Sequence, residues 1–188
     1  MFVAAEGRNR TERNYLKGFM AEHENIVLRM VPQSATDPEG MAGNLASFMK
    51  EAGYSPEDGD LAFCLVDHDC NAGKDAQIQK ALKIARKHGF ELVVSNPCFE
   101  LWFLCHFTAA PRNCSSSKDT VKEVMRYLPQ YAKGDENLYE NTKSHLPDAV
   151  INAKMLEKRC LSRGLEEYRH DFHPSTAMYR MIEKMSAR

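Results

Sequence analysis

Long apolar stretches are missing from this chain of 188 residues. No run approaches the ~20 consecutive apolar residues that a membrane-spanning helix needs. The N-terminal segment MFVAAEGRNR carries an acidic residue, Glu6, and lacks the apolar core of a secretion signal, so we expect a cytoplasmic protein. An excess of one charge is missing too. The formal net charge of -1 excludes a globally basic nucleic-acid binder, although a local basic patch is compatible with it.

Several binding motifs are also absent. The sequence contains neither a P-loop nor a GxGxxG pattern, which argues against an NTPase motor and against a dinucleotide-dependent enzyme. Its 6 cysteines form no CxxC pair and have no zinc-ligand spacing. We therefore expect reduced cytosolic thiols rather than a disulfide framework.

The residues that are present predict an α/β core. With 43% hydrophobic residues the chain can fill one sizeable domain. Nearly continuous apolar runs end at turn residues, and stretches with helical spacing separate them. Strands are expected near residues 2–6, 26–31, 61–66 and 90–95, with helices near 11–22, 41–52, 74–88 and 97–107. This alternation predicts a mostly parallel sheet flanked by helices, in a domain of residues 1–107.

The second part of the chain, residues 108–188, reads differently. After a polar segment, helical patterns run at about 118–128, 147–163 and 174–187, and no further strand is expected. The HDFH segment at 170–173 is interpreted as the entry to the last helix. We expect a helical C-terminal appendage that covers the sheet or binds a partner.

Acidic residues follow two of the predicted strands. Asp67 and Asp69 end the third strand in LVDHD, and Glu6 ends the first. Residues two apart in a strand face the same way, and ligands of open parallel sheets bind beyond the carboxyl ends of the strands. Three carboxylates gathered there repel one another unless a cation intervenes, and Mg²⁺ or Mn²⁺ prefers oxygen ligands. The alternative is that these acids are solvated and cap the helices that follow.

Four segments then support a family resemblance. AAEGRNRTERNYL, LVDHD, SNPCFELWFLCHF and HPSTAMYRMIEKM resemble, in this order, blocks of the RloB-like family of TOPRIM-domain proteins. The resemblance covers nearly the whole chain. It implies a TOPRIM-like fold whose acidic residues bind Mg²⁺, and a role in anti-phage defence by abortive infection. Related defence TOPRIM proteins are considered nucleases, some of them cutting RNA, so DNA or RNA (tRNA included) is the implied substrate.

By position, the resemblance assigns the candidate site. Glu6 matches the TOPRIM glutamate, expected to move a proton or bind the metal, and Asp67 and Asp69 match the metal-binding DxD. Glu100 is a further candidate ligand, or a residue that orients one. The candidate catalytic and metal-binding residues are therefore Glu6, Asp67, Asp69 and Glu100.

Basic side chains near this edge are candidates for contact with a phosphate backbone. They are Arg8, Arg10, Arg13 and Lys74, although a plain solvated lysine is the favoured interpretation of Lys74. His106 is expected to be a buried core histidine.

The function that these residues predict is Mg²⁺-dependent phosphodiester hydrolysis. Two alternatives stay open. One is a non-catalytic metal-binding or nucleic-acid-binding subunit that acts with a defence partner protein; self-association into a homo-oligomer is compatible with either function. The other is a phosphatase with Asp67 as nucleophile, which would need the DxD on the first strand rather than the third.

Overall fold

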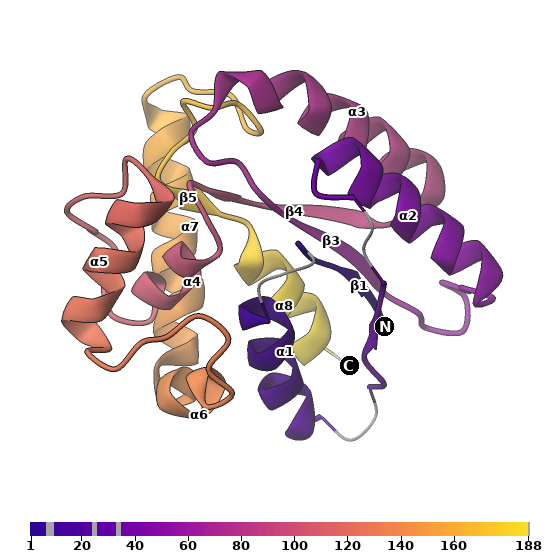
Figure 1. Ribbon diagram of the computed structural model, residues 1–188, viewed down its shortest axis with the longest axis horizontal. Coiled ribbons are helices and arrows are strands. Elements are labelled where there is room, and N and C mark those ends of the chain that lie inside the picture. The colour runs from indigo at the N-terminus through magenta and orange to yellow at the C-terminus, as the bar shows by residue number, and fades with distance from the viewer. Residues whose placement is uncertain (7–9, 24–25, 33–34, 188) are drawn as a thin grey trace. The chain divides into compact units, whose positions relative to one another are not determined.

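The computed structural model describes residues 1–6, 10–23, 26–32 and 35–187, and strands alternate with helices through the first half of the chain (Figure 1). The strands are β1 (Phe2–Ala4), β2 (Arg29–Met30), β3 (Ala62–Asp67), β4 (Glu91–Asn96) and β5 (Ser175–Thr176). The helices are α1 (Thr11–Ala21), α2 (Pro38–Glu51), α3 (Ala72–His88), α4 (Glu100–Cys105), α5 (Ser117–Tyr127), α6 (Leu138–Thr142), the 3₁₀ turn η1 (Lys143–His145), α7 (Leu146–Ser162) and α8 (Met178–Ser186). No described helix is long and apolar enough to cross a membrane.

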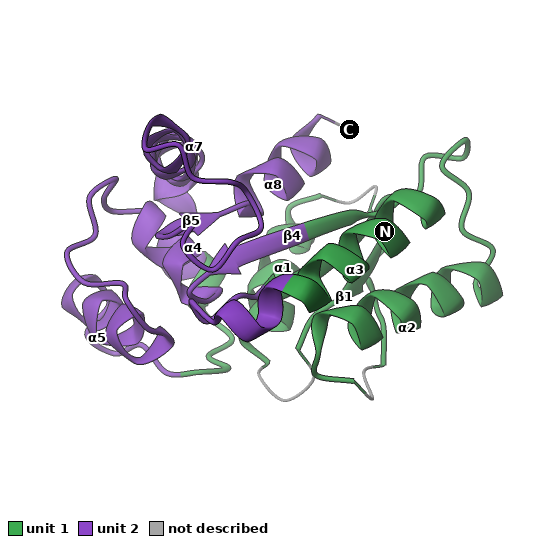
Figure 2. Cartoon of the chain, turned by 90° about the horizontal axis from the view of Figure 1, so that it is seen from above, with its two compact units in different colours: residues 1–66, 76–92, 133–139 green, residues 67–75, 93–132, 140–188 purple. Residues whose placement is uncertain are grey.

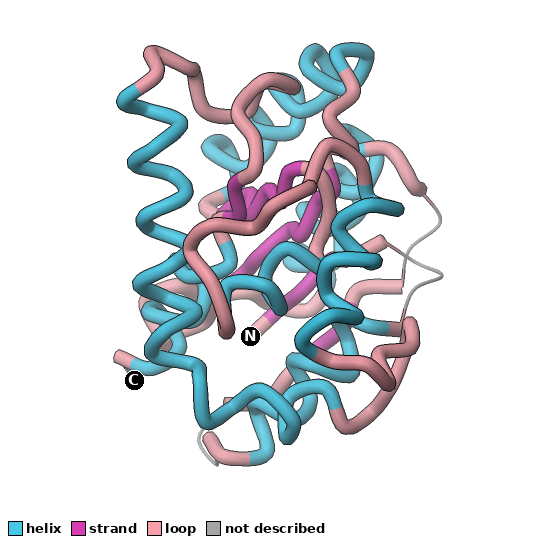
Figure 3. The backbone as a smooth tube through the Cα atoms, turned by 90° about the vertical axis from the view of Figure 1, so that its left-hand side faces the viewer, coloured by secondary structure: helices cyan, strands magenta, loops and turns pink. Residues whose placement is uncertain are grey.

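The strands form one sheet in the order β2-β1-β3-β4-β5. β1 is parallel to β2 and to β3, with Ala4 in register with Cys64, whereas β5 is antiparallel to β4. Figure 3 marks these strands and the helices along the backbone. The predicted fold class is therefore confirmed: a mostly parallel α/β sheet flanked by helices, with further helices toward the C-terminus.

Local sequence explains where these elements begin and end. β3 is an apolar run whose residues are buried up to Val66, as expected for a strand covered on both faces. α2 starts after Asp37, whose side chain accepts a hydrogen bond from the Gly40 N–H at 2.9 Å, and Pro38 occupies its first turn. The Ser116 side chain caps α5 in the same way through the N–H of Asp119.

The chain divides into two compact units that are each built from several segments (Figure 2). Unit 1 contains residues 1–66, 76–92 and 133–139, and unit 2 contains residues 67–75, 93–132 and 140–188. The sequence predicted one division, at residue 107, whereas the compact units alternate along the chain.

In unit 1, the segment 133–139 packs on α1. Tyr139 stacks edge-on against Tyr15 and Phe19, with ring centroids 5.5 and 5.7 Å apart. A Cβ at Gly18 would lie 2.7 Å from the Tyr139 Cβ, so only glycine allows this approach. This segment was expected to belong to the C-terminal appendage, and no periodic pattern in the sequence indicates its contact with α1.

In unit 2, α4 is the central helix, and it contacts both α5 and α7 (Figure 1). Every residue of α4 is buried, Trp102 and Phe103 completely. His106, which follows α4, is 1% exposed and its Nδ1 lies 2.9 Å from the Trp102 carbonyl oxygen. The prediction that His106 is a core histidine is confirmed.

Two predictions for the second part of the chain are wrong. Strands do not cease at residue 108, because Ser175 and Thr176 form β5 against β4, and α6 was not anticipated. The HDFH segment is not a helix entry either, since β5 separates it from α8. A strand of two residues has no period that sequence can reveal. It forms because the edge of β4 offers backbone hydrogen-bonding groups that β5 satisfies.

Candidate metal and catalytic site

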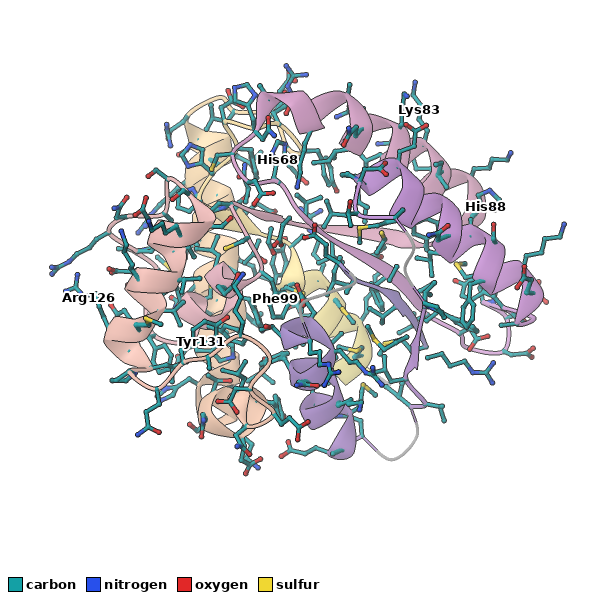
Figure 4. The ribbon with its side chains drawn as sticks, viewed as in Figure 1. His68, Lys83, His88, Phe99, Arg126 and Tyr131 are labelled. Atoms are coloured by element: carbon teal, nitrogen blue, oxygen red, sulfur yellow. The ribbon has the colours of Figure 1, made fainter. Side chains whose placement is uncertain are left out.

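Asp67, the last residue of β3, lies beside the connection from β4 to α4. Its Oδ1 accepts a hydrogen bond from the N–H of Phe99 at 2.8 Å (Figure 4 labels Phe99). Its backbone carbonyl accepts a second bond, from Lys74 Nζ at 2.8 Å. The Asp67 carboxylate is therefore held at the carboxyl ends of β3 and β4, at the edge where ligands of open sheets bind.

Asp69 has different partners, Lys74 and Ser117. Lys74 Nζ lies 2.6 Å from its Oδ2, and Ser117 Oγ donates to its Oδ1 at 2.8 Å. The Asp69 side chain is 43% exposed and that of Lys74 19%, so water screens this ion pair in part. The positive charge beside Asp69 is therefore the ammonium group of Lys74, which also binds the backbone carbonyl of Asp67.

Glu100 begins α4 and is buried. It is 4% exposed, and its Oε1 accepts a hydrogen bond from the Tyr131 hydroxyl at 2.9 Å. A carboxylate in such surroundings needs hydrogen bonds or a counter-charge, because burial removes its hydration. The hydroxyl of Tyr131, a residue labelled in Figure 4, gives Glu100 one hydrogen bond and carries no charge.

The thiol of Cys98 links Asp67 to Glu100. Burial raises the pKa of Cys98, and the nearby charges of Glu100 and Asp67 raise it further. This thiol is therefore protonated and unreactive at neutral pH. The charges of Glu100 and Asp67 therefore both act on this one thiol of unit 2.

The remaining described residues of the prediction belong to unit 1. Glu6 follows β1 in unit 1 and is half-buried, while Arg10 and Arg13 are exposed at the start of α1. Arg8 lies outside the described residues. The structure thus joins Lys74 to Asp67 and Asp69, and Asp67 to the residue before Glu100. A shared metal site of these acids with Glu6 stays a prediction.

A second cluster beside the DxD was missed by the sequence reasoning. Asp75, 9% exposed, accepts hydrogen bonds from the backbone N–H of His170 at 2.8 Å and from its ring Nδ1 at 3.0 Å. Arg169 Nε lies 3.4 Å from the Asp75 carboxylate. Burial alone would raise the pKa of Asp75, but His170 and Arg169 outweigh it and lower that pKa. The HDFH segment at 170–173, interpreted from the sequence as a helix entry, contains the His170 of this cluster.

His68, between the two aspartates of the DxD, also faces Asp75. Its Nε2 lies 3.1 Å from the Asp75 Oδ1, although it is not aligned for a hydrogen bond (Figure 4). Burial is the main influence on the pKa of His68 and lowers it, so this imidazole is neutral near pH 7. The pKa of Asp75 is lowered by His170 and by the charge of Arg169, so this lowering does not require a charge on His68.

The chemical type of these donor atoms suits a hard cation, but their present spacing does not. Carboxylate oxygens are the ligands that Mg²⁺ and Mn²⁺ prefer. Within the described part of the chain, however, no three histidine, cysteine or acidic side chains stand close enough together to hold a metal ion. Asp69 would have to exchange Lys74 for the metal, and a further acid would have to join.

Comparison with known proteins gives one match. The family model described as RloB-like protein matches residues 1–185. No curated protein and no solved structure matches the chain. Because the model spans nearly every residue, the chain belongs to the RloB-like protein family.

Proposed function

We propose that this protein is a Mg²⁺-dependent nuclease that hydrolyses phosphodiester bonds of DNA or RNA, tRNA included, in anti-phage defence. The observation that carries the proposal is the hydrogen bond from the Phe99 N–H to the Asp67 carboxylate, which places Asp67 at the carboxyl ends of β3 and β4, next to the residue that precedes Glu100. Family membership and the resemblance of the DxD to TOPRIM motifs support it.

The cation would be held by Asp67, Asp69 and Glu100, with Glu6 as the acid that joins them. β1 and β3 are neighbouring parallel strands, so the residues that follow them emerge at the same edge of the sheet, which favours Glu6 as that acid. When bound, Mg²⁺ or Mn²⁺ would polarise the phosphate and stabilise the leaving oxygen.

The chain's own residues would supply the rest. Glu6 is proposed to move the proton of the attacking water. Lys74 would leave Asp69 for a substrate phosphate, and Arg8, Arg10 and Arg13 would attract the phosphate backbone. Tyr131 holds the Glu100 carboxylate by its hydrogen bond and would orient it as a ligand.

The test is incubation of the purified protein with plasmid DNA and with total tRNA, in Mg²⁺, Mn²⁺ or EDTA. We expect cleavage only with a divalent cation. Glu6→Gln and Asp67→Asn should each lose at least the ~100-fold in rate that even supporting-shell changes reach. The matched controls are Glu39→Gln, whose partner is Lys80 on the surface, and Asp58→Asn, which is exposed. Undiminished cleavage in EDTA would contradict the proposal.

One observation favours a second candidate, a non-catalytic subunit that acts with a partner protein. Lys74 binds both the Asp67 carbonyl and the Asp69 carboxylate, which neutralises part of the DxD without a metal. This candidate predicts that the wild-type protein cuts neither DNA nor RNA in any of the three conditions, and that Asp67→Asn leaves its binding of nucleic acid unchanged.

A further inference from the structure

The segment Arg169–Thr176, which we call the strap, joins α7 to α8 and lies against the DxD turn (Asp67–Asp75) in unit 2. Its end is β5, in which Ser175 pairs with Asn96 and Thr176 with Ser95. Tyr168, just before the strap, has a left-handed φ of 67°. The strap also contains His170, whose bonds to Asp75 were described above. It therefore contacts both the end of β4 and the DxD turn that follows β3.

Asn96 is the residue through which the strap and the DxD turn are joined. It is 1% exposed, and its side-chain Nδ2 lies within hydrogen-bonding distance of three strap carbonyls, those of Arg169 (3.3 Å), His170 (3.0 Å) and Phe172 (3.2 Å). Its Oδ1 accepts a bond from the N–H of Cys70 at 3.0 Å. This one amide therefore uses its donors on the strap and its acceptor on the DxD turn.

The turn that Asn96 holds is strained. Asp69 and Cys70 have left-handed φ values of 59° and 52°, a conformation that costs non-glycine residues about 1–3 kcal/mol each. Such a backbone persists only where its surroundings enforce it. Here Asn96 binds the N–H of Cys70, and the Pro97 carbonyl accepts the N–H of Asp69 at 2.7 Å. The conformation sets the direction in which the Asp69 carboxylate leaves the chain.

Asp75 fixes the other end of the turn. Its carboxylate binds the strap through His170 and Arg169, and it contacts His68 between the two aspartates. Next to this contact lies a small cavity of about 20 Å³, lined by His68, Asn96 and Arg169 among others, with room for one water molecule. Both ends of the DxD turn are thus attached to the same strap.

We propose that Asn96 and Asp75 are positioning residues, which use the strap to hold the backbone of the DxD turn, from which Asp67 and Asp69 would reach the cation once Asp69 exchanges Lys74 for it. The inference rests on the proposed function. It also gives the C-terminal part of the chain a role in the site itself: the strap completes the scaffold of the DxD.

The test compares Mg²⁺ binding by folded variants, measured by isothermal titration calorimetry. Asn96→Asp keeps the acceptor for Cys70 and removes the donors to the strap. We expect its Mg²⁺ dissociation constant to rise by about 10–100-fold, the effect of losing supporting-shell contacts. Cleavage should recover when Mg²⁺ is raised to saturation. Asp75→Asn, which removes the charge that binds Arg169, should behave in the same way and serves if Asn96→Asp does not fold.

Ser95→Ala is the matched control. It removes the hydrogen bond between the Ser95 and Thr176 hydroxyls, 2.8 Å apart, from the same pair of strands but makes no side-chain contact with the DxD turn. We expect it to lower the melting temperature and to leave the Mg²⁺ dissociation constant unchanged. If the folded Asn96→Asp and Asp75→Asn proteins bind Mg²⁺ as tightly as wild type, this inference is overturned and the proposed function is not. A wild-type protein that binds no Mg²⁺ overturns the proposed function, and this inference with it.

Discussion

At the scale of the residue, Lys74 is paired with Asp69, one of the proposed metal ligands. Its ammonium group binds Asp69 Oδ2, so Mg²⁺ must compete with it. Lys74→Met should therefore tighten Mg²⁺ binding, by up to about fivefold, since a partly exposed ion pair is worth about 0.2–1 kcal/mol. Calorimetric titration of the variant with Mg²⁺ measures this, with Lys83→Met, on the outer surface of α3, as control (Figure 4). Weaker Mg²⁺ binding by Lys74→Met would show that Lys74 supports the metal site instead of competing for it.

At the scale of the element, α4 couples the stability of unit 2 to pH through His106. Burial lowers the pKa of His106 to about 4. In the unfolded chain this histidine takes up its proton near pH 6.5, so the unfolded state binds more protons between these values and stability falls as the pH drops. From pH 7 to pH 5 the loss is about 2 kcal/mol. His106→Asn, which keeps a donor for the Trp102 carbonyl, should reduce this loss in urea unfolding at the two pH values. His88→Asn, exposed at the end of α3, should show the full wild-type loss (Figure 4).

At the scale of the whole molecule, a bound cation should stabilise the folded protein against heat. Mg²⁺ at a hundredfold excess over its dissociation constant adds about 2.7 kcal/mol, which corresponds to roughly 5–10 °C for a chain of this size. If Glu6 joins the site, Glu6→Gln should lose most of this gain while melting near the wild-type temperature in EDTA. Differential scanning fluorimetry with and without Mg²⁺ checks the prediction, and Glu39→Gln should keep the full gain. An equal Mg²⁺ shift in wild type and Glu6→Gln would remove Glu6 from the set of ligands.

Much of the architecture could be predicted from the sequence, because it depends on local patterns. The apolar run that ends at Val66 predicts a buried strand and places Asp67 at its carboxyl end, and burial of its residues up to Val66 confirms the strand. Helical spacing around Trp102 predicts a core helix, and α4 is entirely buried. The resemblance of four ordered blocks to the RloB-like family could also be recognised without the structure. These features follow from periodicity and composition, which each segment carries by itself.

Only the tertiary structure decided which partners the site residues have. The sequence made Glu100 a candidate ligand but did not indicate Tyr131 as its partner, because this hydrogen bond spans 31 positions of sequence. Asn96 and Asp75 look like ordinary polar residues until the strap, more than 70 positions away, supplies their bonds. A contact between distant segments depends on how the whole chain closes and leaves no period in either segment. The sequence by itself determined which acids end the strands, and the fold determined what holds them.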